Sequence, residues 1–174
     1  MEVAIGLLLA RVIIGLGLAA HGAQKLFGWF GGYGLAGTGG FFESLGFKPG
    51  TLFAFVAGVG ELLGGLLTFA GWLNPIGPAL IIAVMIVAIG SVHLPKGYWQ
   101  ANGGYELNLA YIAGALLVAF GGAGRLSADA LAPLPALAHP ATGWIVIVIA
   151  VVGGLLSLAI RHRPKAAQTQ AAAG

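Results

Sequence analysis

Residues 3–25 read VAIGLLLARVIIGLGLAAHGAQK, and Arg11 is the single charged side chain before His21 in this stretch. A helix that crosses a bilayer needs about 20 mostly apolar residues, so residues 3–20 are predicted to span it, with an extension through Lys25. Further stretches that meet this criterion are residues 51–70, 75–92, 106–122 and 142–160. The chain is therefore predicted to be an all-α integral membrane helix bundle.

Composition favours a protein that is surrounded by lipid. Of the 174 residues, 59% are hydrophobic and 7% are charged, and the mean hydropathy is +0.96. Soluble domains have about 25% charged residues, so this chain has too few charges to cover a water-facing surface. The net charge of +3 is concentrated near one end, which indicates membrane topology rather than a nucleic-acid surface. Cysteine is absent, which excludes disulfides, thiol chemistry and cysteine-ligated metal clusters on this chain.

The connections between the apolar segments differ in character. Residues 28–50 are rich in glycine and aromatic residues, a composition that suits the headgroup layer. Within them, residues 41–47 are either a short interfacial helix or an ordinary loop. The next connection is short. Asn74 is predicted to cap a helix that opens with Pro75, which makes the second and third segments a tight hairpin.

The lysines and arginines predict the orientation of the bundle, because cytoplasmic loops carry an excess of basic residues. With the N-terminus outside, the basic residues on the cytoplasmic side are Lys25, Lys48, Lys96, Arg161, Arg163 and Lys165. Arg125 alone then faces out. The opposite orientation reverses this distribution, so an outside N-terminus and a cytoplasmic C-terminus are predicted.

Two ionisable side chains, Arg11 and Glu61, lie deep in apolar segments. Such groups cost about 2.5–3.5 kcal/mol each to insert, so they normally have partners. Consecutive helices usually pack as an antiparallel hairpin, and we therefore predict an Arg11–Glu61 ion pair. The pair either fixes the helix register or takes part in function. Gly60 and Gly64 form a GxxxG pattern that permits close helix contact beside Glu61.

Other polar side chains gather at helix ends that share one side of an alternating bundle. We call this set the polar mouth, and its members are His21, Gln24, Lys25, His93, Tyr105, Glu106 and Asn108. Histidine with a carboxylate can move protons near neutral pH. Histidine and lysine can donate hydrogen bonds to a quinone carbonyl, and Trp29, Tyr98 and Trp99 can flank a flat ring.

Three other readings of the polar mouth stay open. A haem held by His21 and His93 is conceivable, although two histidines are a weak signal. A metal site of His21, His93 and Glu106 lacks the close ligand spacing typical of such sites. The third reading is that these polar residues only anchor helix ends at the membrane interface.

Three stretches together resemble one family. Residues 11–28 read RVIIGLGLAAHGAQKLFG, residues 60–65 read GELLGG, and residues 122–129 read GAGRLSAD. With His93 and Glu106, these stretches resemble the DoxX family of small bacterial and archaeal membrane proteins. The resemblance covers roughly residues 5–130, and the combination of motifs is more specific than each motif alone.

The resemblance implies a four-helix transmembrane bundle in a prokaryotic cytoplasmic membrane. The family's namesake is a subunit of a thiosulfate:quinone oxidoreductase, so a quinone-linked redox role follows as an expectation. By resemblance, the polar positions of the family are occupied by Arg11, His21, Lys25, Glu61, His93, Glu106, Arg125 and Asp129. Proton handling is assigned to His21, Glu61 and Glu106. Binding of a quinone is assigned to Arg11, Lys25, His93, Trp99 and Tyr105.

The chain extends beyond the family's bundle. Residues 1–130 are predicted to form the DoxX-like four-helix core, and residues 131–163 a linker with a fifth transmembrane helix. Residues 164–174 are expected to be a disordered tail. The fifth helix suggests docking to other membrane subunits, so the alternative function is a non-catalytic subunit of a respiratory or photosynthetic complex. A small transporter or proton path is less favoured, since the chain has no inverted repeat.

Overall fold

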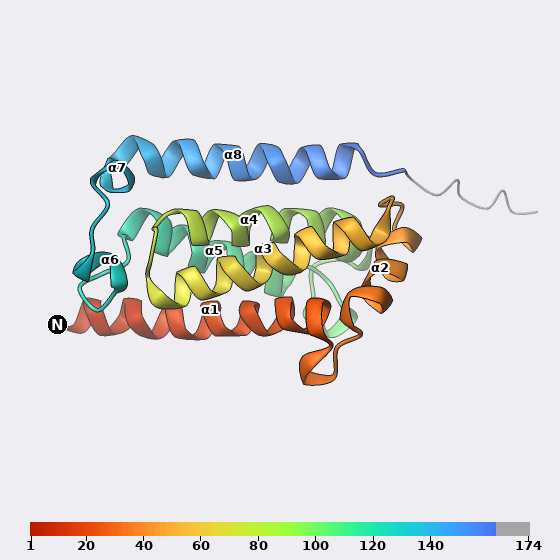
Figure 1. Ribbon diagram of the computed structural model, residues 1–174, viewed down its shortest axis with the longest axis horizontal. Helices are drawn as coiled ribbons and strands as arrows, with labels where there is room; N and C mark the ends of the chain where they lie inside the picture. Colours follow the sequence, from red (N-terminus) through yellow and green to blue (C-terminus); the bar gives the residue numbers. More distant parts are fainter. Residues whose placement is uncertain (163–174) are drawn as a thin grey trace, which may run out of the picture.

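Within residues 1–162, five long helices lie side by side along the long axis of the molecule (Figure 1). They are α1 (Glu2–Phe27), α3 (Gly50–Ala70), α4 (Ile76–Ala88), α5 (Glu106–Gly121) and α8 (Pro140–Ala159). Short helices join them: η1 (Trp29–Gly31), α2 (Gly34–Ser44), η2 (Ile89–His93), η3 (Leu94–Lys96), η4 (Gln100–Asn102), α6 (Ala128–Leu131) and α7 (Pro135–Ala138). This computed structural model describes residues 1–162, so the tail expected to be disordered, residues 164–174, lies outside the described residues.

The lengths of these helices fit a membrane bundle. Helices long and apolar enough to cross a membrane are Glu2–Phe27, Gly50–Ala70, Ile76–Lys96 and Pro140–Ala159. The third of them continues from α4 through η2 and η3. Helix α5 is apolar but has 16 residues, about 24 Å at 1.5 Å per residue, which is shorter than the usual span. The predicted all-α membrane helix bundle is confirmed.

Glycines bring the backbones of α1 and α3 into contact. A Cβ atom added at Gly15 would lie 2.7 Å from the carbonyl oxygen of Gly65. One added at Gly22 would lie 2.7 Å from the carbonyl oxygen of Gly58. Both distances are too short for real side chains, so glycine is required at these crossings. The GxxxG glycines face α4 instead, where a Cβ at Gly64 would lie 2.9 Å from the Cβ of Leu80.

This register shows that the predicted Arg11–Glu61 ion pair is wrong. Because Gly15 meets Gly65 and Gly22 meets Gly58, Arg11 lies at the level of the C-terminal end of α3, beside Gly71. That level is ten residues beyond Glu61, or about 15 Å along the helix. Arg11 instead donates a hydrogen bond from Nη2 to the carbonyl oxygen of Leu126. The prediction failed because it matched depths from the hairpin alone and ignored the glycine contacts.

Asp129 closes this end of the bundle. Its two carboxylate oxygens accept hydrogen bonds from the backbone nitrogens of Leu73 and Asn74, each at 2.9 Å. Its own backbone nitrogen donates to the carbonyl oxygen of Gly71 at 3.0 Å. The predicted cap by the Asn74 side chain is wrong, because that side chain donates from Nδ2 to the carbonyl oxygen of Ala119 at 3.3 Å. The residue that satisfies this turn comes from a segment 55 positions away.

The long connection at residues 28–50 contains a helix, as one of the two interpretations of residues 41–47 predicted. The helix, α2, covers Gly34–Ser44 and so begins earlier than predicted. Helix α2 ends at Ser44 and packs on α3. Phe42 and Phe47 are buried against Ala54. This aromatic cluster fixes α2 over the N-terminal end of α3.

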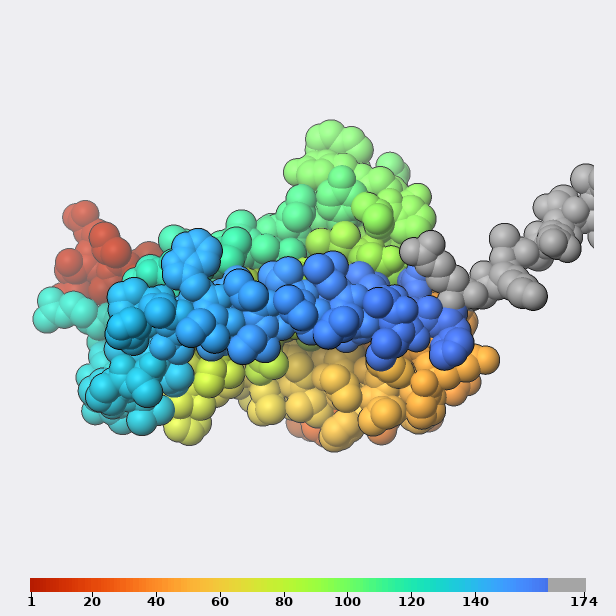
Figure 2. All heavy atoms as spheres, turned by 90° about the horizontal axis from the view of Figure 1, so that it is seen from above, coloured from red at the N-terminus to blue at the C-terminus, as the bar shows by residue number. Residues whose placement is uncertain are grey.

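Helix α8 lies on the outside of α4 (Figure 2). The contact is close, because a Cβ added at Gly154 would lie 3.0 Å from the carbonyl oxygen of Ala83. His139 caps the start of α8 by accepting a hydrogen bond at Nδ1 from the backbone nitrogen of Ala141, at 3.2 Å. The predicted fifth segment is thus a long apolar helix that packs mainly on α4.

Candidate functional site

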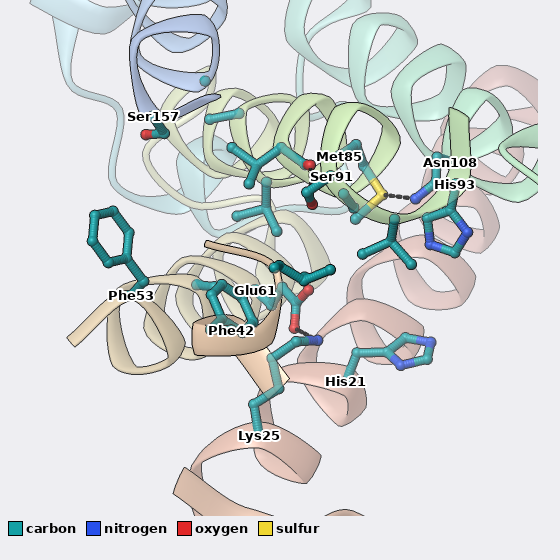
Figure 3. Close-up of a pocket in the computed structure, with 18 of the residues that line it drawn as sticks. His21, Lys25, Phe42, Phe53, Glu61, Met85, Ser91, His93, Asn108 and Ser157 are labelled. Atoms are coloured by element: carbon teal, nitrogen blue, oxygen red, sulfur yellow. Dashed lines mark hydrogen bonds and ion pairs between the residues drawn. The ribbon is translucent and has the colours of Figure 1, made fainter. Parts of the chain in front are cut away.

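A cavity of about 390 Å³ opens inside the half of the bundle where α1 ends and α3 begins (Figure 3). Its walls come from α1, α2, α3, α4, η2, α5 and α8. Most of the lining is aliphatic or aromatic. The polar and sulfur-bearing members of the lining are His21, Lys25, Glu61, Met85, Ser91, His93, Gln100, Asn108, Tyr111 and Ser157. We call this space the cavity.

An ion pair lies at the centre of the polar lining. Lys25 Nζ is 2.5 Å from Glu61 Oε2, and the two side chains are 25% and 5% exposed. Side chains on a helix lean toward its N-terminus. Since α1 and α3 are antiparallel, Lys25 leans toward the middle of the bundle while Glu61 leans toward Lys25. The opposite lean of the two side chains lets Lys25 Nζ reach Glu61 Oε2, although the two backbone positions lie at different levels along the bundle.

Two histidines flank the ion pair on one side of the cavity (Figure 3). His21 lies one turn before Lys25 on α1, and its Nδ1 is 3.1 Å from Oε1 of Gln24. His93 ends η2, and its Nδ1 is 2.7 Å from the carbonyl oxygen of Gly103. A carbonyl oxygen only accepts, so Nδ1 of His93 donates and Nε2 is the nitrogen left for another partner.

A π-helical turn positions His93. Helix α4 changes at Ile89 into the π-helix η2, which ends at His93. Such turns are rare and often occur at functional sites, since they re-aim the side chains that follow them. Ser91, within this turn, donates its hydroxyl to the carbonyl oxygen of Val87 at 2.6 Å. The sequence predicted an uninterrupted helix here.

Helix α5 adds two further polar groups to the lining. Asn108 is 8% exposed and donates from Nδ2 to Sδ of Met85 at 3.4 Å. Tyr111 follows one turn later and lies against α1, because a Cβ added at Gly17 would be 2.8 Å from its hydroxyl oxygen. Sequence reasoning missed Tyr111 and Met85. Tyr111 could have been found from the sequence, because it lies three residues after Asn108, on the same face of an apolar helix.

The other predicted site residues lie outside the cavity lining. Glu106 Oε2 accepts a hydrogen bond from the backbone nitrogen of Gln100 at 3.0 Å and so holds the loop that leads Gln100 to the cavity. Trp99 and Tyr105 both stack edge-on against Tyr98, with ring centroids 5.0 and 5.6 Å apart. Trp99 is 63% exposed.

Two more of the residues predicted to take part in the site, Trp29 and Arg11, do not line the cavity. Trp29 contacts Phe27 and Phe30 instead of the cavity. Arg11 lies at the opposite end of the bundle, beside Gly71 and Leu126. The structure therefore brings together His21, Lys25, Glu61, His93 and Asn108, and it separates them from Arg11.

Comparison with known proteins identifies the family. A family model described as DoxX matches residues 6–94. The chain belongs to the DoxX family. No curated protein and no solved structure matches the chain.

The DoxX match covers only part of the cavity. It runs from α1 to the start of η3, and it includes His21, Lys25, Glu61 and His93. Asn108 and Tyr111 on α5 lie beyond it, as does the whole of α8. The DoxX region thus supplies the ion pair and both histidines, while the remaining walls come from the rest of the chain.

Among residues 1–162 of this DoxX protein, no group of three or more histidine, aspartate or glutamate side chains is placed to hold a metal ion. The alternative site of His21, His93 and Glu106 is therefore not formed. The Glu106 carboxylate accepts a hydrogen bond from the backbone nitrogen of Gln100, which explains why these three side chains do not converge.

Proposed function

We propose that this DoxX protein is a quinone-linked membrane redox subunit, and that the quinone binds in the cavity beside the Lys25–Glu61 pair. The observation that carries the proposal is the convergence of polar groups from α1, α3, η2 and α5 on one mostly apolar cavity. A volume of about 390 Å³ is within the usual range for small-molecule sites. Such sites combine apolar walls with a few convergent polar groups, as this one does.

The residues suited to hold the ring of a quinone are donors. The ammonium group of Lys25 has three N–H donors. One of them donates a hydrogen bond to Glu61, so the others are left for a carbonyl oxygen. His21 and His93 stand on the same side of the pair. Phe42 and Tyr111 line the walls and offer flat surfaces to a ring. A bound quinone would supply the electron chemistry.

The same residues form an ordered set for moving protons. His21 is exposed, Lys25 is partly buried and Glu61 is buried, so the set leads from the surface to the interior. His21 and Glu61 both line the cavity. Histidine and carboxylate side chains are the usual groups for proton transfer near neutral pH. We assign to His21 and Glu61 the exchange of protons between the cavity and water.

The predicted residues outside the lining have supporting roles in this proposal. Glu106 is a positioning residue, because it fixes the loop that carries Gln100. Trp99 and Tyr105 stabilise the same loop through Tyr98. Arg11 holds the far end of the bundle and does not touch the ligand.

Location in a prokaryotic cytoplasmic membrane is part of the proposal. Lys25, Lys48, Lys96 and Arg161 belong to loops and helix ends on the cavity side of the alternating bundle, and exposed Arg125 belongs to the other side. Because cytoplasmic loops carry an excess of basic residues, this distribution supports a cavity end that faces the cytoplasm.

The test is to purify the protein in native-lipid particles from quinone-containing membranes and to quantify extracted quinone by mass spectrometry. We expect about one quinone per chain, and a large loss in Glu61→Gln. Glu2→Gln is the matched control, since Glu2 is exposed at the other end of α1. Absence of quinone from wild-type particles, together with no saturable binding of added quinone, contradicts the proposal. Intact co-purification with partner subunits would then favour the accessory-subunit alternative.

A further inference from the structure

The cavity has a second, apolar half on the far side of Glu61. In Figure 3, Phe53 and Ser157 lie across Glu61 from His21 and His93. The cavity lining contributed by α2, the segment that follows it, α3 and α8 is mostly apolar. Its members other than Glu61 include Phe41, Phe42, Leu45, Phe47, Phe53, Val56, Gly153, Gly154 and Ser157.

The hydroxyl group of Ser157 in this half has a partner within the protein. It donates to the carbonyl oxygen of Gly153 on its own helix, at 2.8 Å. Because this hydroxyl is satisfied, it presents a wall that suits hydrocarbon. His21, His93 and Asn108, in contrast, lie on the other side of Glu61 (Figure 3).

The apolar half reaches the outer surface of the bundle. Lining residues that are also exposed mark the place: Val56 on α3, Phe41 on α2 and Gly153 on α8. Val56 is six residues from the start of α3, and Gly153 is six from the end of α8, about 9 Å along each helix. Apolar surface at this position on a spanning helix faces lipid. We call the exposed edge of the cavity that Val56 and Gly153 mark the portal.

The two neighbouring glycines of α8 have different surroundings. A Cβ at Gly154 would lie 3.0 Å from the carbonyl oxygen of Ala83, so Gly154 is needed for packing on α4. A Cβ at Gly153 would meet no atom within 4 Å. Packing therefore does not require glycine at position 153, and a larger side chain there would enter the portal.

We propose that the portal holds the hydrocarbon chain of the ligand, so the ligand is a membrane-dissolved amphiphile with a flat polar head and a long apolar tail. The head lies at Lys25–Glu61, and the tail passes between Phe53 and Gly153 into the bilayer. This inference rests on the proposed function and specifies its ligand class. It also gives α8, which lies outside the DoxX match, a role in selecting the tail.

The experiment compares two probes on the full chain in lipid nanodiscs: a dimethoxy-methyl-benzoquinone without a tail, and the same ring with a decyl tail. Gly153→Leu fills the portal. Gly121→Leu is the matched control, since Gly121 also has no atom within 4 Å of its added Cβ and does not line the cavity. Val56→Trp fills the portal from α3 and replaces Gly153→Leu if that variant misfolds.

We expect Gly153→Leu to weaken binding of the decyl probe by about tenfold, the size of a typical overpacking penalty, and to leave binding of the tailless ring within about twofold. Gly121→Leu should change neither. Equal effects of the portal variants on both probes, or no effect on either, overturn the portal and leave the proposed function standing. Failure of wild-type protein to bind either probe overturns the proposed function and the portal with it.

Discussion

At the scale of single residues, the central feature is a buried carboxylate with one cationic partner. Glu61 is 5% exposed, and the Lys25 ammonium lies 2.5 Å from its Oε2. A buried ion pair adds little net stability, because desolvation offsets the attraction. Loss of one partner is costly, because the remaining charge stays buried without compensation.

Lys25→Met should therefore lower the free energy of unfolding by about 3 kcal/mol, the low end for breaking a buried pair, since Lys25 is 25% exposed. The double variant Lys25→Met with Glu61→Leu should recover most of this loss. Unfolding in mixed detergent measures both. If the double variant is as unstable as the single one, Lys25 does not stabilise the fold by neutralising Glu61.

Gly71 shows a different constraint at the other end of the bundle. Its φ is +61°, a left-handed conformation that costs a non-glycine residue about 1–2 kcal/mol, and an added Cβ would collide with the Arg11 guanidinium. Gly71→Ala should therefore destabilise the protein by at least about 2 kcal/mol. Thermal unfolding in detergent is the measurement.

Gly121→Ala is the control for Gly71→Ala, because its added Cβ meets no atom within 4 Å. It should leave the midpoint of unfolding almost unchanged. Quinone binding by folded Gly71→Ala protein should match wild type, since Gly71 is at the end remote from the cavity. A selective loss of binding would show that this end influences the ligand site.

At the scale of helices, the α1–α3 crossing sets the positions of Lys25 and Glu61. Gly22→Ala would place a Cβ 2.7 Å from the carbonyl oxygen of Gly58. The helices must separate, so we expect a loss of about 1–3 kcal/mol together with weaker quinone binding. Gly6→Ala on the same helix has no neighbour within 4 Å and should be neutral in both assays. Normal binding in Gly22→Ala would show that the crossing does not position the site.

The sequence predicted where the long helices lie but not how they are aligned with one another, and the difference has a physical reason. Apolar length alone located α1, α3, α4, α5 and α8, since lipid imposes one requirement on every span. The partner of Glu61 was not found, because the register depends on which glycines meet. Gly15 with Gly22 and Gly58 with Gly65 share a spacing of seven residues, and matching these pairs would have placed Arg11 beside Gly71. The sequence carries no pattern that indicates the π-helical turn ending at His93.

At the scale of the whole molecule, alternating helices place the polar residues of distant segments at one end. This is why His21, His93 and Asn108 could be grouped from the sequence, although side-chain contacts such as Glu106 with Gln100 could not. The cavity itself depends on α2 and α8, whose positions follow from packing on α3 and α4. Phe42 of α2, for example, is buried against Ala54 of α3.

Orientation can be tested through the absence of cysteine, since each introduced cysteine is then the sole thiol of the chain. Lys48→Cys and Arg125→Cys place exposed thiols at opposite ends of the bundle. Membrane-impermeant maleimide on intact cells should label Arg125→Cys, and Lys48→Cys only after the membrane is opened. The reverse pattern would place the cavity end outside.

The most direct test of the ligand site is a density map of the purified protein with its native lipids. We expect a flat density between His21, His93 and the Lys25–Glu61 pair, with a tail that continues past Phe53 toward Gly153. A cavity filled by rearranged side chains, or by an ordinary phospholipid chain with no ring beside Glu61, would contradict it.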